Sequence, residues 1–157
     1  MKERIAILKS EMERDYKRLN ILFDKFEKSY SEFLGREEYS KLVESAFYVN
    51  QIYSGFENIF KNIAGTFENT IEKDYWHKSL LERISLDIQG IRPALVSEES
   101  YQCLNELRAF RHFFHHAYGA DIDKEKFKIV ADKVYRIKGL FGREIERFSA
   151  FLDKLME

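Results

Sequence analysis

Apolar side chains recur at steps of three and four residues along most of the chain, which is the period of an α-helix with one buried face. The first such stretch runs over Lys2–Phe33, and Gly35 is expected to end it. The second runs over Glu37–Ala64, with Gly65 expected to end it, and its main apolar positions are Leu42, Ala46, Val49, Tyr53, Phe56, Phe60 and Ile63. Phe47, Ile52 and Ile59 widen that face, so we expect this helix to lie at the centre of a bundle.

Three further helices are predicted after the polar loop at Thr66–Lys73. A short one covers Tyr75–Asp87, with Trp76, Leu80, Leu81 and Ile84 turned inward. The next begins at Ser97, a typical N-cap followed by acidic residues, and ends near Tyr118. The last covers Asp123–Leu155, with an apolar stripe from Phe127 to Leu155. No strand is predicted, so the expected fold is all-α, an antiparallel helical bundle of four to five helices in a single domain over residues 1–157.

Composition narrows the class of protein. Hydrophobic residues make up 45% of the chain, enough for a core, while 34% are charged. No apolar run approaches the ~18 residues that a membrane span needs, and no signal peptide is seen. The only cysteine, Cys103, permits no internal disulfide and is expected to be a small buried residue, so a cytoplasmic location is expected.

The formal net charge of −1 conceals an uneven distribution. Residues 101–147 hold 10 Lys and Arg against 7 Asp and Glu, and most of this excess lies in the last predicted helix. Such a stretch is either a solvated helix face or a modest basic surface for phosphates. The charge alone favours the solvated face.

Three of the four histidines fall within five residues, at His112, His115 and His116, close to Arg108 and Arg111. One interpretation is a metal site, because His112 and His116 are four residues apart, but further ligands are missing unless Asp121 and Asp123 reach the site. Another is purely structural, since histidines near a helix end interact with exposed carbonyls. A third is acid–base chemistry on a phosphodiester, in which imidazole moves protons and guanidinium stabilises the phosphorane.

The residues behind the third interpretation also resemble the motif of a known family. Arg111, four residues, His116, Ala117 and Tyr118 match the R-x4-H-x-Y motif of the HepT-like ribonucleases of the HEPN superfamily, and the polar residue that follows the motif arginine is His112. The segment Trp76-His77-Lys78-Ser79-Leu80-Leu81 resembles the short middle helix of that family. Arg92-Pro93-Ala94-Leu95 with Glu98-Glu99-Ser100 resembles its lead into the motif helix.

This resemblance implies a toxin of a type VII-like toxin–antitoxin system, a homodimer that cleaves RNA without a metal or other cofactor. It assigns Arg111 and His116 to catalysis. It also implies that a nucleotidyltransferase antitoxin inactivates the protein by attaching AMP to Tyr118. His112 and Arg108 are expected to support the site or bind phosphate, with Glu106 an alternative partner for Arg108. His115 is expected to pack or cap, and a structural role is favoured for His77.

Helix geometry adds a constraint on the motif. Five residues turn a helix by roughly 500°, which leaves Arg111 and His116 about 140° apart. The two side chains then need either a distorted helix or a second chain to form one site, and twofold pairing of the motif helices offers the second solution.

Two other classes of function stay open. One is a non-catalytic helical module that binds a nucleotide or a partner, with Arg111 and the histidines holding a phosphate. The other is a plain helical interaction protein, which the histidine cluster disfavours. An intact Arg, His and Tyr favours the active ribonuclease.

Overall fold

A computed structural model of the chain describes residues 1–68, 76–117 and 121–157, and for Trp76 the backbone only. The described part contains five helices and no named strand: α1 (Lys2–Arg36), α2 (Tyr39–Phe67), α3 (Trp76–Ile84), α4 (Glu98–His116) and α5 (Lys124–Met156). The predicted all-α bundle is therefore confirmed. No helix in these ranges is long and apolar enough to cross a membrane.

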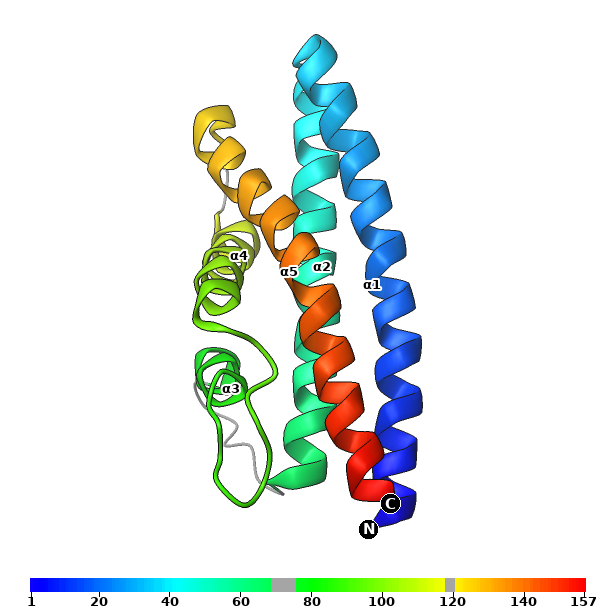
Figure 1. Cartoon of the computed structure of the whole chain (residues 1–157). Coiled ribbons are helices and arrows are strands. Elements are labelled where there is room, and N and C mark those ends of the chain that lie inside the picture. The colour runs from blue at the N-terminus through cyan, green and yellow to red at the C-terminus, as the bar shows by residue number, and fades with distance from the viewer. Residues whose placement is uncertain (69–75, 118–120) are drawn as a thin grey trace.

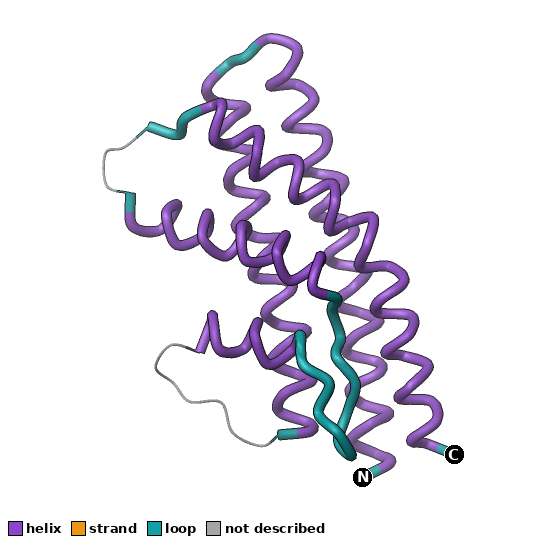
Figure 2. The backbone as a smooth tube through the Cα atoms, turned by 60° about the vertical axis from the view of Figure 1, so that its left-hand side comes forward, coloured by secondary structure: helices purple, strands orange, loops and turns teal. Residues whose placement is uncertain are grey.

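The long helices α1, α2 and α5 lie side by side, with α1 antiparallel to the other two, while α3 and α4 cover the other side of α2 (Figure 1). Figure 2 shows α4 crossing the long helices at an angle, with α3 beside it. Helix α2 contacts all four others, which confirms its predicted central place. Below, α1, α2 and α5 are called the long-helix group and α3 and α4 the short-helix group.

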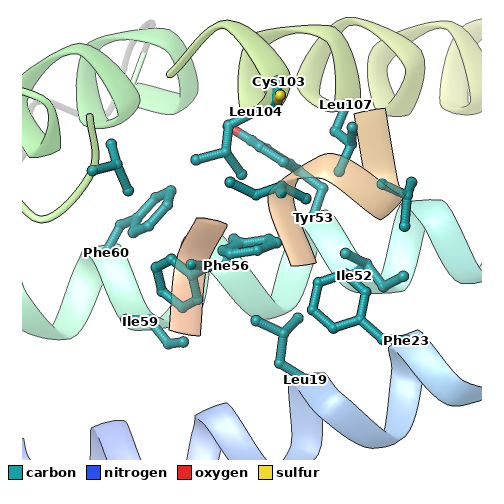
Figure 3. Packing of buried hydrophobic residues seen from close by; sticks show 14 of the residues in the cluster. Leu19, Phe23, Ile52, Tyr53, Phe56, Ile59, Phe60, Cys103, Leu104 and Leu107 are labelled. Atoms are coloured by element: carbon teal, nitrogen blue, oxygen red, sulfur yellow. The ribbon is translucent and has the colours of Figure 1, made fainter. Parts of the chain in front are cut away.

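The predicted stripes form one continuous core. Phe56 of α2 and Phe23 of α1 both belong to this core (Figure 3), and their ring centroids are 6.1 Å apart. The ring of Phe141 on α5 has its centroid 4.9 Å from that of Phe56. Two predicted core positions are wrong, because Phe47 is 44% exposed and Leu155 is 42% exposed. Both lie where no described helix covers them, at the edge of α2 and in the last turn of α5.

The two glycines expected to stop helices do not. Helix α1 continues through Gly35 to Arg36, and its C-cap residue Glu37 adopts a left-handed conformation with φ 53°. Helix α2 continues through Gly65 to Phe67, whose ring packs against Phe148 and Phe151 of α5. A glycine within a helix costs only about 1 kcal/mol, so packing of the next turn can outweigh it.

Helix α4, which carries the motif, is fixed at its start by polar contacts. Ser97 is the N-cap as predicted, and its hydroxyl accepts a hydrogen bond from the Ser100 backbone N–H. The buried carboxylate of Glu144 on α5 accepts from the Ser97 backbone N–H and from the Ser100 hydroxyl, each at 2.6 Å. A carboxylate at a helix N-terminus also complements the helix dipole, so Glu144 locks α4 onto α5.

The segment before α4 is held by a buried ion pair. The side chain of Arg92 is fully buried and donates to Glu68 at 2.7 Å. It also donates to the backbone oxygens of Arg83 and Leu86, near the end of α3. These contacts tie the end of α2, the end of α3 and the lead into α4 together.

Candidate active site

A hollow of about 440 Å³ opens between α3 and the second half of α4. Its lining side chains are His77, Arg108, Arg111, His112, His115 and His116. All four histidines of the chain therefore gather around one cavity, together with two arginines. Arg111, His116, His112 and Arg108, the four site residues expected along the motif helix, all contribute. Tyr118 lies outside the described residues.

The helix is regular from Arg111 through His116, so the 140° offset between them persists. Around the circumference of the helix, Arg108, His112 and His115 lie between Arg111 and His116. The five side chains therefore line one continuous hollow. Neither a distortion of this segment nor a second chain is needed to bring them to one cavity. The expectation based on the offset is corrected in this respect.

Arg111 is anchored on α2. Its Nε donates to the hydroxyl of Ser54 at 3.2 Å, and a terminal nitrogen lies 3.9 Å from the carboxylate of Glu57. The Arg111 side chain keeps 26% of its surface exposed. The guanidinium is thus positioned from one side and faces the hollow with the other, as a group that must contact a phosphate requires.

Glu57 has a second partner, His77. Its other carboxylate oxygen lies 2.6 Å from Nδ1 of His77, while the glutamate itself is only 3% exposed. Because a carboxylate accepts, Nδ1 of His77 carries the hydrogen. His77 therefore makes a structural contact, the kind of role favoured for it from the sequence, and it also lines the hollow.

His116 is oriented by the preceding turn. Its Nδ1 lies 2.8 Å from the backbone oxygen of His112, which can only accept, so Nδ1 is the protonated nitrogen. The rings of His112 and His116 stack with centroids 4.3 Å apart. His112 therefore supports the plane of the His116 ring, and Nε2 of His116 is the atom that can exchange a proton with a ligand.

Arg108 and His115 complete the wall. Arg108 donates twice to the side-chain oxygen of Asn105, at 3.1 and 2.9 Å, and makes no ion pair with Glu106 within the described residues. His115 is exposed and touches the ring of Phe114 edge-on. Neither contact closes the hollow, so both side chains can face a ligand.

A buried tyrosine, Tyr53, lies about one turn before Glu57 on α2. Tyr53 points toward α4 beside Leu104 (Figure 3), and its hydroxyl has no hydrogen-bond partner among the described residues. Burial raises the pKa of Tyr53 well above its ordinary value. The nearby side-chain oxygen of Asn50 on α2 is also unsatisfied within the described ranges.

Sequence reasoning missed Ser54 and Glu57. They follow Asn50 at steps of four and three, so the three form a polar stripe along the most apolar helix of the chain. Polar groups on a buried helix need partners. That pattern was the available signal, although it does not name the partners.

Asp121 and Asp123 were considered as further ligands of a metal site. The aspartates considered as metal ligands have other roles: Asp123 caps α5 through the backbone N–H groups of Glu125 and Lys126, and Asp121 lies near the hydroxyl of Tyr39. Within residues 1–68, 76–117 and 121–157, no three His, Cys, Asp or Glu side chains are grouped to hold a metal ion.

Half of the eight Lys and Arg residues between 124 and 147 are paired with acidic side chains. Lys124 and Lys128 pair with Glu37, and Arg136 and Lys138 pair with Glu99 and Glu27 on neighbouring helices. These pairs fit a solvated face better than a surface for phosphates. Cys103 is buried as expected, and burial raises the pKa of its thiol.

A family model described as HepT-like protein matches residues 44–152. The chain belongs to the HepT-like family. The HepT-like match begins in α2 and ends in α5, so it covers every residue of the hollow together with Ser54 and Glu57, and it leaves out α1. Searches of curated proteins and of solved structures gave no match.

Proposed function

We propose that the protein is a metal-independent endoribonuclease that acts as the toxin of a type VII-like toxin–antitoxin system. The observation that carries the proposal is the hollow in which Arg111 and His116 of the motif meet, both held by defined hydrogen bonds. Membership of the HepT-like family supports the same class of activity.

The reaction uses a nucleophile that RNA itself supplies. The 2′-oxygen attacks the neighbouring phosphorus, and the bond to the 5′-oxygen breaks. The products are a 2′,3′-cyclic phosphate and a free 5′-hydroxyl. Arg111 stabilises the charge on the phosphorane, His116 transfers a proton, and Arg108 and His112 help to hold the phosphate.

Purified protein incubated with total RNA in EDTA tests this function. Arg111→Ala and His116→Ala should each lower the cleavage rate by at least about 100-fold, the usual cost of losing such groups. Their melting transitions should stay close to wild type, because both side chains line the hollow rather than the core. Arg36→Ala removes an exposed guanidinium from α1 and serves as the control. Cleavage by either motif variant at the wild-type rate would contradict that residue's role.

The rival function, a non-catalytic phosphate-binding module, gives a different result in the same experiment. Such a module would retain RNA or a nucleotide without cutting it. Arg111→Ala would then weaken binding, and no cyclic phosphate would form with any variant.

We also propose that the protein is a homodimer, as the resemblance implies. Sedimentation at working concentration tests the assembly. Mixing Arg111→Ala chains with His116→Ala chains tests whether the site is shared. Because one chain supplies both residues to its own hollow, we expect no recovery of activity beyond that of the separate variants. Strong recovery would show that each site takes residues from both chains.

Neutralisation is proposed to occur at Tyr118, by transfer of AMP from a partner nucleotidyltransferase. Tyr118 directly follows Ala117, the residue that ends α4 beside the hollow. An added AMP would bring a negative phosphate next to a site for a polyanion and repel RNA. Incubation with the nucleotidyltransferase, ATP and magnesium should add AMP mass to wild type and abolish cleavage. Tyr118→Phe should gain no mass and keep cutting, whereas an adduct on another residue would contradict the assignment.

A further inference from the structure

Cleavage by 2′-oxygen attack needs two proton transfers, one from the 2′-hydroxyl and one to the 5′-oxygen that leaves. The motif contributes one histidine that can exchange a proton through Nε2, His116. The wall of the hollow contains a second imidazole that is positioned from outside the motif. This is His77 of α3, which lines the same hollow as the residues of the motif helix.

His77 has the surroundings of a proton acceptor. Its Nδ1 donates to the buried carboxylate of Glu57 at 2.6 Å, and its side chain keeps 42% of its surface exposed. A carboxylate in this position fixes the tautomer, so that Nε2 is the nitrogen that can take a proton. It also stabilises the imidazolium that results, as the aspartate does in a serine protease triad.

His116 can exchange a proton through the same ring nitrogen. It is the last residue of α4, and the backbone oxygen of His112 accepts a hydrogen bond from its Nδ1, which leaves Nε2 for a ligand. His77 differs from His116 in having a buried carboxylate on Nδ1, which stabilises the charge that a base acquires when it takes a proton. The hollow is therefore lined by two imidazoles that are positioned by different partners.

We propose that His77 is a second catalytic residue, the general base that takes the proton of the 2′-hydroxyl, with Glu57 as its positioning residue and His116 as the general acid. This assignment rests on the proposed ribonuclease function. As the bond from the 2′-oxygen to phosphorus forms, Nε2 of His77 receives the proton. As the bond from phosphorus to the 5′-oxygen breaks, Nε2 of His116 donates one. Water then returns both rings to their starting states.

The shared carboxylate links this base to the guanidinium. Glu57 lies between His77 and Arg111, and Ser54 holds Arg111 from the same helix. The side chains for accepting the proton and for stabilising the phosphorane are thus positioned from adjacent turns of α2. Both would be displaced together by a shift of that helix.

The test compares His77→Asn with wild type on RNA in EDTA. Asparagine places an amide nitrogen where Nδ1 stood, so it keeps a donor to Glu57 but cannot accept the proton. Cleavage should fall by about 100-fold or more, the usual contribution of a general base. Lys78→Ala, on the exposed side of the same helix, is the matched control and should cut normally. Cleavage by His77→Asn within about 3-fold of wild type would overturn the proposal, since general-base loss costs far more.

A second substrate separates a chemical role from a structural one. RNA with sulfur in place of the 5′-bridging oxygen has a leaving group that needs no proton. His116→Ala should recover most of its lost rate on this substrate, whereas His77→Asn should not, because the 2′-hydroxyl still needs a base. Rescue of His77→Asn, or equal rescue of both variants, would overturn the assignment.

Failure of this inference and failure of the proposed function give different results. If wild type cuts RNA and Arg111→Ala does not, a fully active His77→Asn removes only the role of His77. If wild type cuts no RNA in EDTA, the proposed function fails and the inference fails with it.

Discussion

The long-helix group and the short-helix group are stabilised in different ways. Between α1, α2 and α5 the contacts are chiefly apolar, with stacked and edge-on aromatic rings around Phe56. Around α3 and α4, buried charged residues add directional contacts to the apolar ones, through Glu57, Arg92 and Glu144. The first group follows from periodicity along each helix, whereas the second depends on partners far away in the chain.

The difference explains where chemistry can be placed. Apolar attraction is non-directional, whereas the hydrogen bonds of a buried carboxylate are directional and fix where its partners lie. Helix α2 serves both groups, since one face carries Phe56 and another carries Ser54 and Glu57. The rigid apolar side therefore supports a polar side that sets the geometry of the hollow.

The largest expected effect is in the long-helix group. Phe56→Ala should lower the free energy of unfolding by about 4 kcal/mol, because it removes a buried ring and leaves a cavity. Phe47→Ala, on the exposed edge of the same helix, should cost less than about 1 kcal/mol and serves as the control. Denaturant unfolding measures both, and equal losses would contradict the difference between the two faces of α2.

Next is the ion pair that holds the short-helix group. Arg92→Ala should cost about 3 kcal/mol, because it removes the closer of two guanidinium partners of the buried Glu68 and leaves the longer contact from Arg83. Native-state hydrogen exchange should show the loss mainly in α3 and at the start of α4. An equal rise of exchange across α1 and α5 would show that the two groups do not open separately.

A smaller loss is expected where α5 holds the start of α4. Glu144→Ala should cost about 2 kcal/mol, because the Ser97 backbone N–H and the Ser100 hydroxyl lose their acceptor. Glu146→Ala removes an exposed carboxylate from the same helix and should change the unfolding free energy by less than about 0.5 kcal/mol. Thermal unfolding of both variants checks this, and similar midpoints would contradict the anchoring role of Glu144.

The smallest effect should have the opposite sign. Tyr53→Phe should leave stability unchanged or raise it by about 1 kcal/mol, because it removes a buried hydroxyl without a partner among the described residues. Tyr39→Phe is the contrast, since the Tyr39 hydroxyl accepts a hydrogen bond from the Ile122 backbone N–H at 3.0 Å, and it should destabilise slightly. Calorimetry compares the two, and a marked loss with Tyr53→Phe would indicate a partner for its hydroxyl.

The sequence predicted the fold better than it predicted the helix ends. Periodicity identified all five helices because each buried stripe is a local pattern. Gly35 and Gly65 were wrongly predicted to end helices. Nothing in their surroundings requires a glycine, and contacts of the following residues decide where each helix ends. Phe47 was placed in the core because a helical pattern does not show which edge stays uncovered.

Some residues of the candidate site could also be found from the sequence, whereas others could not. Arg108, Arg111, His112 and His116 come from one short segment of α4, so their grouping was visible in the sequence. The contributions of Glu57, Ser54 and His77 were not, because they depend on how α2 and α3 pack against α4. A polar stripe on an apolar helix indicates that partners exist, but only the tertiary arrangement identifies them.

The carboxylate of Glu57, shared between Arg111 and His77, also constrains how such a chain can evolve. Loss of Glu57 alone would leave Arg111 and His77 without their shared acceptor, while loss of either partner would leave Glu57 with the other one. Each single change therefore alters the contacts of the other two side chains, and the three positions are expected to change in combination. The three side chains form one connected group from three helices, and the short linear motif contains only Arg111 of that group.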